Sequence, residues 1–162
     1  IKETKLLYVG RVKKEKGIFS LVNLLKDKKD ISLTIVGEEK NQKNIIQENV
    51  KVYEIEDDTK NLIKFYDDHN IFVLPSFTEG HPMVVLESLA RLRPVIIFED
   101  IEHIIENKKG IFVSKRDKES FFKKIEYIKN NINKIQEEMK KNKLPKNEEF
   151  IRDLARSISN LN

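Results

Sequence analysis

The chain has 162 residues, which is enough for one domain with a hydrophobic core and too few for two ordinary domains. It has no cysteine, which excludes disulfides and thiolate metal sites and suits a cytoplasmic protein, and no apolar run approaches the roughly 18 residues of a membrane span. The formal net charge is +4, but the lysines are scattered among nearly as many acidic residues, so no nucleic acid partner is expected.

Short apolar segments alternate with helical patterns along most of the chain. Strands are predicted at residues 6–9, 33–36, 50–53, 71–74, 95–98 and 111–113. Helices are predicted at residues 18–26, 41–48, 59–68, 82–92, 101–106, 118–140 and 148–160. This alternation predicts an α/β fold of the doubly wound, Rossmann-like kind, with a parallel sheet of about six strands and C-terminal helices after the last strand.

Charged residues follow two of the predicted strands, in the turns at residues 10–17 and 79–83. In an open parallel sheet the ligand crevice lies at the carboxyl ends of the strands. We therefore expect one edge of the sheet to carry the candidate site residues, which are Arg11, Lys16, Glu79 and Glu87.

The predicted helix that Pro82 opens is a candidate anion site. Proline presets the first helical turn, and the first amides of a helix have no acceptor within it. The amides concerned are those of Met83, Val84 and Val85, and the positive end of the helix dipole would add to them. This helix start therefore predicts a bound phosphate.

Two carboxylates, Glu79 and Glu87, lie eight positions apart around this helix start. Glu87 falls in an otherwise apolar helix, where an unpartnered carboxylate would cost several kcal/mol. Paired hydroxyls such as those of a ribose would satisfy it, and an ion pair with Arg91 is the alternative. Glu79, next to Gly80 at the mouth of the helix, is placed to bind sugar hydroxyls or to face a developing positive charge.

The segment VGRVKKEKG, residues 9–17, is the second candidate element. Gly10 turns the chain after a strand, and Arg11 and Lys16 frame the loop that follows. A diphosphate between a guanidinium and an ammonium group would relieve their repulsion through charge-assisted hydrogen bonds. The alternative is a loop of solvated lysines.

The histidines do not indicate a metal site. His69, His81 and His103 show no metal-ligand spacing, and the sequence motifs of hydrolases, dehydrogenases and P-loop proteins are missing from the sequence. We expect His81 to contribute shape or a backbone amide at the mouth of the anion site.

Residues 115–143 combine apolar residues at helical spacing with many lysines. Such a helix either packs its apolar face on its own domain, which is the preferred interpretation, or makes a peripheral contact with an anionic membrane.

The pattern VGR…EKG followed by PSxxEGxPxxxLE resembles the C-terminal half of retaining glycosyltransferases of the two-domain GT-B class, in particular family 4. By this resemblance, Arg11 and Lys16 would hold the diphosphate of a UDP- or GDP-sugar and neutralise the leaving nucleotide. Glu79 would contact the donor sugar, the amides after His81 would line sugar and phosphate, and Glu87 would bind the ribose. No metal and no other cofactor is implied.

The same resemblance implies that residues 1–162 form the donor domain of a larger enzyme, whose N-terminal domain carries the acceptor site. The reaction would transfer a hexosyl group, with retention, to an acceptor sugar or lipid-linked glycan. Polysaccharide, lipopolysaccharide or glycolipid synthesis would then be the setting, in the cytoplasm or at the inner face of the plasma membrane. The fragment alone is expected to be inactive.

The chain also departs from the family pattern in residues 52–56 and 91–101. Arg91-Leu92-Arg93 replaces a small residue and glycine, the acidic residues 99–100 replace a Gly-Gly turn, and the strand at residues 52–55 lacks the usual glycine. These departures leave two alternatives: a degenerate, non-catalytic binding or interaction module, and a nucleotide-sugar epimerase of the same fold.

Overall fold

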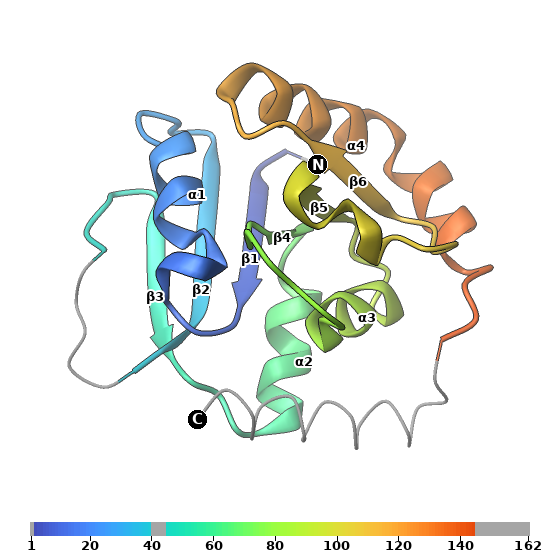
Figure 1. Cartoon of the computed structure of the whole chain (residues 1–162), viewed down its shortest axis with the longest axis horizontal. Helices are drawn as coiled ribbons and strands as arrows, with labels where there is room; N and C mark the ends of the chain where they lie inside the picture. Colours follow the sequence, from blue (N-terminus) through green and yellow to red (C-terminus); the bar gives the residue numbers. More distant parts are fainter. Residues whose placement is uncertain (1, 40–44, 145–162) are drawn as a thin grey trace.

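A computed structural model of the chain describes residues 2–39 and 45–144. Its six strands form one parallel sheet in the order β3-β2-β1-β4-β5-β6 (Figure 1). The predicted doubly wound α/β fold is therefore confirmed. The strands are β1 (Thr4–Val9), β2 (Ile31–Glu38), β3 (Val50–Glu54), β4 (Ile71–Leu74), β5 (Val95–Phe98) and β6 (Ile111–Ser114).

Both flanks of the sheet carry helices. Two of them begin at an aspartate whose carboxylate accepts backbone amide hydrogens, Asp58 before α2 and Asp117 before α4, and this arrangement stabilises a helix start. The α-helices are α1 (Ile18–Leu24), α2 (Thr59–Asp67), α3 (Met83–Ala90) and α4 (Lys118–Met139), and the 3₁₀ segments are η1 (Lys14–Lys16) and η2 (Glu99–Ile104).

The strand order places the helices in two layers. From β1 the chain moves through α1 to β2, and from β4 it moves through α3 to β5, in opposite directions across the sheet. Because such crossovers are right-handed, α1 and α3 lie on opposite faces. Figure 1 shows α2 beside α3, and hydrogen bonds from Arg91 and Arg93 to the end of α2 join them. The ammonium group of Lys28, after α1, lies 4.3 Å from the ring centroid of Phe122 in α4.

The sequence prediction differs from the structure between β2 and β3. Residues 45–48 are not helical, and residues 41–44 of the predicted helix lie outside the described residues. The side-chain amide of Asn49 explains the difference, because it contacts three carbonyl oxygens of the α1–β2 connection at 2.7–3.1 Å. These contacts fix the entry into β3. The predicted helix at residues 101–106 is the 3₁₀ segment η2, and that at residues 148–160 lies outside the described residues.

The apolar face of α4 packs on its own domain, as the preferred interpretation states. Its buried residues are Phe121, Ile125, Ile128, Ile135 and Met139. This face therefore belongs to the hydrophobic core and is not available to a membrane. Within the described residues, no helix combines the length and apolarity that crossing a membrane requires.

β1 and β4 are neighbours in the sheet, and the chain leaves their carboxyl ends toward opposite faces. This is the topological switch point, where open parallel sheets bind ligands. Gly17 makes the close packing at this edge achievable. It has a φ of 69°, and a Cβ atom there would lie 1.9 Å from the carbonyl oxygen of Pro75.

Replacing Gly17 by alanine should therefore lower the free energy of unfolding by more than about 1 kcal/mol, because the new methyl group meets backbone and the φ is unfavourable. Gly80→Ala is the matched control, since a Cβ atom there has nothing within 4 Å. It should change the free energy of unfolding by less than about 0.5 kcal/mol. Denaturant unfolding measures both, and equal losses would contradict the packing described here.

Candidate functional site

A pocket of about 240 Å³ opens at the carboxyl ends of β1 and β4. Most residues predicted from the sequence to form a site contribute to its wall. The lining consists of Tyr8, Val9, Gly10, Lys16, Leu74, Glu79, His81, Pro82, Met83 and Val84. Segments around residues 8–16 and 74–84 thus meet at the switch point.

Lys16 and Glu79 form an ion pair in this wall. The Lys16 ammonium group donates to Oε1 of Glu79 at 2.8 Å, and the hydroxyl of Ser76 donates to the same oxygen at 2.7 Å. The Glu79 side chain is only 10% exposed and that of Lys16 30%, so water screens the pair less than it screens a surface pair. Glu79 is therefore held by η1 on one side and by its own loop on the other.

The loop that carries Glu79 is also tied through its backbone. The amide of Phe77 donates to the carbonyl oxygen of Glu15 at 3.0 Å. The carbonyl oxygen of Glu79 accepts from Nε2 of His103, in η2, at 2.8 Å. Three segments distant in sequence thus fix the position of this carboxylate.

The start of α3 supplies part of the predicted anion site. Pro82 is the N-cap rather than the first helical residue, and no side chain in the part of the chain that the structure describes caps the helix. Among the described residues, the amides of Met83 and Val84 have no acceptor. The amide of Val85 donates to the carbonyl oxygen of Pro82 at 3.1 Å, so the expectation that it is open to a ligand is wrong. The first turn of α3 is wound more tightly than an α-helix, and the Val85 amide is bonded within it.

Glu87 is buried in α3, one helical turn beyond Met83 and Val84, and does not line the pocket. Its side chain is 1% exposed, and Oε2 accepts a hydrogen bond from the hydroxyl of Tyr66, in α2, at 2.6 Å. Oε1 is buried and has no hydrogen-bond partner among the described residues. Burial raises the pKa of Glu87 to about 8, against which the Tyr66 hydrogen bond acts. The predicted alternative, an ion pair with Arg91, is wrong because Arg91 pairs with Asp67.

The structure brings the remaining predicted residues less directly to the pocket. Arg11 is half-buried, and its carbonyl oxygen accepts from the Tyr8 hydroxyl at 2.8 Å, but it does not line the pocket. Gly80 and Val85 line a small adjacent hollow of about 20 Å³.

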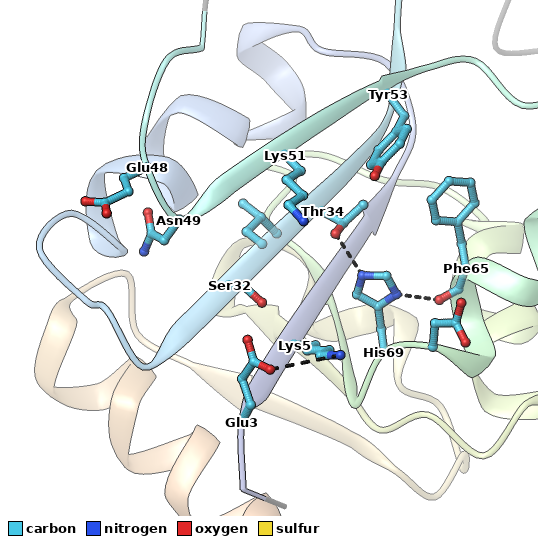
Figure 2. A pocket seen from close by; sticks show the side chains of 12 residues that line it. Glu3, Lys5, Ser32, Thr34, Glu48, Asn49, Lys51, Tyr53, Phe65 and His69 are labelled. Atoms are coloured by element: carbon cyan, nitrogen blue, oxygen red, sulfur yellow. Dashed lines mark hydrogen bonds and ion pairs between the residues drawn. The ribbon is translucent and has the colours of Figure 1, made fainter.

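A larger hollow of about 480 Å³ lies over β1, β2 and β3, away from the switch point (Figure 2). Nδ1 of His69 donates to the carbonyl oxygen of Phe65 at 2.6 Å, and Nε2 lies 2.8 Å from the Thr34 hydroxyl. Burial lowers the pKa of His69, which agrees with a neutral ring in this arrangement. Lys5 and Lys51 are offset by carboxylates in the same wall, and none of the predicted site residues lies there. This hollow lacks the charge pattern of an anion site.

Sequence reasoning missed several residues of the site. Ser76 is the serine of the motif PSxxEGxPxxxLE, three residues before Glu79, and its hydroxyl is the signal in the sequence that could have identified it. Tyr8 and Tyr66 lie in an apolar strand and an amphipathic helix, where nothing marks them. Among the described residues, no group of three or more His, Asp or Glu side chains is arranged to hold a metal ion.

Comparison with known proteins gives a family match and several similar folds. The family model described as "Glycosyl transferases group 1" matches residues 2–144. No curated protein sequence gives a significant match.

Sucrose-phosphate synthase from Thermosynechococcus elongatus has a TM-score of 0.70 at 20% identity, covering 98% of this chain and 45% of that one. The catalytic domain of cholesterol-α-glucosyltransferase from Helicobacter pylori has a TM-score of 0.64 at 16% identity, covering 98% and 99%. HepE from Anabaena, in complex with UDP-glucose, has a TM-score of 0.67 at 12% identity, covering 99% and 46%. At these identities the likeness shows the fold, and the chain spans less than half the length of the first and third proteins.

The pKa of Glu87 makes a pH-dependent prediction. The folded-state pKa of about 8 exceeds the ordinary 4.5, so the stability that the protonated carboxyl contributes is complete below about pH 4.5 and is lost as pH rises through 8. Glu87→Gln keeps a neutral group at every pH. The free energy of unfolding of Glu87→Gln, relative to that of the wild type, should therefore increase between pH 5 and 8 by an amount on the order of a few kcal/mol.

Chemical unfolding at a series of pH values measures this difference. Glu99→Gln, which changes an exposed carboxylate, is the matched control and should show no such trend. A difference between Glu87→Gln and wild type that stays constant from pH 5 to 8 would rule out a buried, neutral Glu87.

Proposed function

Because the chain belongs to the glycosyl transferases group 1 family, we propose that it is the donor-binding domain of a retaining GT-B glycosyltransferase of family 4. In this proposal the domain binds a UDP- or GDP-sugar without a metal ion. The diphosphate lies at Lys16 and the start of α3, the sugar at Glu79, and the ribose at Glu87. Arg11 reaches the diphosphate from the adjoining turn.

The observation that carries the proposal is the Lys16–Glu79 ion pair in the wall of the switch-point pocket. A diphosphate brings more negative charge to the Lys16 ammonium group than one carboxylate does, and Met83 and Val84, whose amides have no acceptor among the described residues, line the same pocket. A donor would therefore displace Glu79 from Lys16. The displaced carboxylate would then be available to the sugar hydroxyls.

The chemistry follows from that exchange of partners. When the bond between the sugar and the diphosphate breaks, negative charge develops on the leaving phosphate oxygen. Fixed positive groups around that oxygen lower the barrier, and here they would be Lys16, Arg11 and the α3 amides. The hexosyl group would pass, with retention, to a hydroxyl of the acceptor.

The unpartnered Oε1 of Glu87 supports the ribose assignment. A buried polar atom without a hydrogen bond is rare in folded proteins and calls for an explanation. A ribose hydroxyl that reaches this carboxyl past Met83 and Val84 would provide the missing partner.

The rest of the enzyme is proposed from the family. An N-terminal domain would supply the acceptor site, and the acceptor would be a sugar or lipid-linked glycan used in polysaccharide, lipopolysaccharide or glycolipid synthesis. The enzyme would work in the cytoplasm or at the inner face of the plasma membrane. Residues 1–162 alone would bind donor but not transfer.

Calorimetric titration with UDP, GDP, UDP-glucose and GDP-mannose tests donor binding. One of the nucleotides should bind equally well with and without EDTA, and Lys16→Ala should weaken that binding by about 1–3 kcal/mol, the scale of a charge-assisted hydrogen bond. If the folded domain binds none of the four ligands, the non-catalytic interaction module becomes the better hypothesis.

Glu79→Gln should distinguish the proposed role of Lys16 in binding the diphosphate from the proposed role of Glu79 in binding the sugar. The amide no longer neutralises Lys16, so affinity for the free nucleoside diphosphate should stay constant or rise. The nucleotide-sugar should lose affinity by about 1–2 kcal/mol, because a carboxylate no longer accepts its hydroxyls.

Glu15→Gln removes a neighbouring, exposed negative charge without touching the ion pair and is the matched control. Equal losses for nucleotide and nucleotide-sugar in Glu79→Gln would contradict the assignment of Glu79 to the sugar.

A further inference from the structure

Arg116, in the connection between β6 and α4, lies against the loop that carries Glu79. Its Nη1 donates to the carbonyl oxygen of Pro75 at 2.8 Å, and its guanidinium carbon lies 4.0 Å from the ring centroid of Phe77. The same carbon lies 4.4 Å from the ring centroid of Phe98. Arg116 thus lies close to two aromatic rings while it bonds to the backbone before Glu79.

Asp100, in η2, completes the arrangement. Its carboxylate accepts from Nη2 of Arg116 at 2.8 Å. Asp100 is one of the acidic residues 99–100, which stand where the family pattern described above has a Gly-Gly turn. In this chain the departure has a structural counterpart, because the acidic residue orients the guanidinium group.

A surface ion pair alone would not indicate a functional role, since exposed ion pairs contribute little to stability. Three features distinguish Arg116. Its side chain is only 19% exposed, its guanidinium group lies close to two aromatic rings, and it contacts the segment 75–77 directly. Lysine could keep the charge but neither the fork of donors nor the planar stacking.

The segment that Arg116 holds leads straight into the site. Ser76, whose hydroxyl donates to Oε1 of Glu79, is completely buried. The amide of Phe77 bonds to Glu15, in the η1 segment that also carries Lys16. Any shift of residues 75–77 would therefore displace the Glu79 carboxylate.

We propose that Arg116 is a positioning residue for the donor sugar: held by Asp100, it fixes residues 75–77 and thereby the place of the Glu79 carboxylate. The inference rests on the proposed function, because it takes Glu79 as the sugar contact. Lys16 extends from η1, so binding of the nucleoside diphosphate should depend much less on Arg116.

The test compares Arg116→Gln and Arg116→Lys with Lys115→Gln, an exposed neighbour that loses the same charge. Titrations with UDP, UDP-glucose, GDP and GDP-mannose give the affinity ratio between nucleotide-sugar and nucleotide for each variant. Both Arg116 variants should lower that ratio roughly tenfold, the effect of one hydrogen bond to a charged group, while the affinity for the nucleotide changes less than about twofold. Lys115→Gln should leave the ratio unchanged.

A second measurement does not depend on any ligand. Amide hydrogen exchange of Phe77 reports opening of the segment that Arg116 holds. Exchange should be about tenfold faster in Arg116→Gln and in Asp100→Asn, and the double variant should resemble Arg116→Gln alone, because both residues act through one contact.

The outcomes separate this inference from the proposed function. Arg116 variants that lose thermal stability but keep the affinity ratio would show a merely structural role and overturn the inference. The inference would also be overturned if the wild type binds nucleotides and Arg116→Lys has the same affinity ratio as the wild type. A folded wild type that binds none of the four ligands would overturn the proposed function, and with it this inference.

Discussion

An ammonium group and a carboxylate from distant segments meet at the edge of the sheet where β1 and β4 end. The Lys16–Glu79 contact of 2.8 Å joins the turn after β1 to the loop after β4. The two strands are neighbours whose chains leave toward opposite faces, and the two loops are joined by this ion pair and by the backbone hydrogen bond from Phe77 to Glu15. The ion pair thus joins the two loops at this edge, and each of its two charged groups lines the pocket.

The other charged groups around the pocket are held in different ways. Glu87 is kept neutral by burial and bonded to Tyr66, whereas Arg116 donates to Asp100 and lies close to two aromatic rings. Arg91 and Arg93 bond to the end of α2, which carries Tyr66. The residues that depart from the family pattern thus form part of the frame around the site.

Sequence alone predicted the parallel sheet and the edge that carries the site, because buried strands and their turns leave strong local patterns. Of the residues predicted to gather there, Lys16, Glu79 and His81 line one pocket, whereas Arg11 and Glu87 do not. Sequence reasoning missed contacts that exist only after folding, such as Arg116 with Pro75, 41 positions apart. It misjudged the segment before β3, where Asn49 fixes an irregular backbone that helical periodicity does not reveal. Whether the Val85 amide is open depends on how tightly the first turn winds, which residue types do not determine.

The exchange of partners at Lys16 is the central claim, and a crystal structure with bound UDP or GDP tests it most directly. The claim predicts diphosphate oxygens within hydrogen-bond distance of the Lys16 ammonium group and the amides of Met83 and Val84, with the Glu79 carboxylate turned away from Lys16. A nucleotide bound in the hollow over β1, β2 and β3, with the Lys16–Glu79 pair intact, would contradict it.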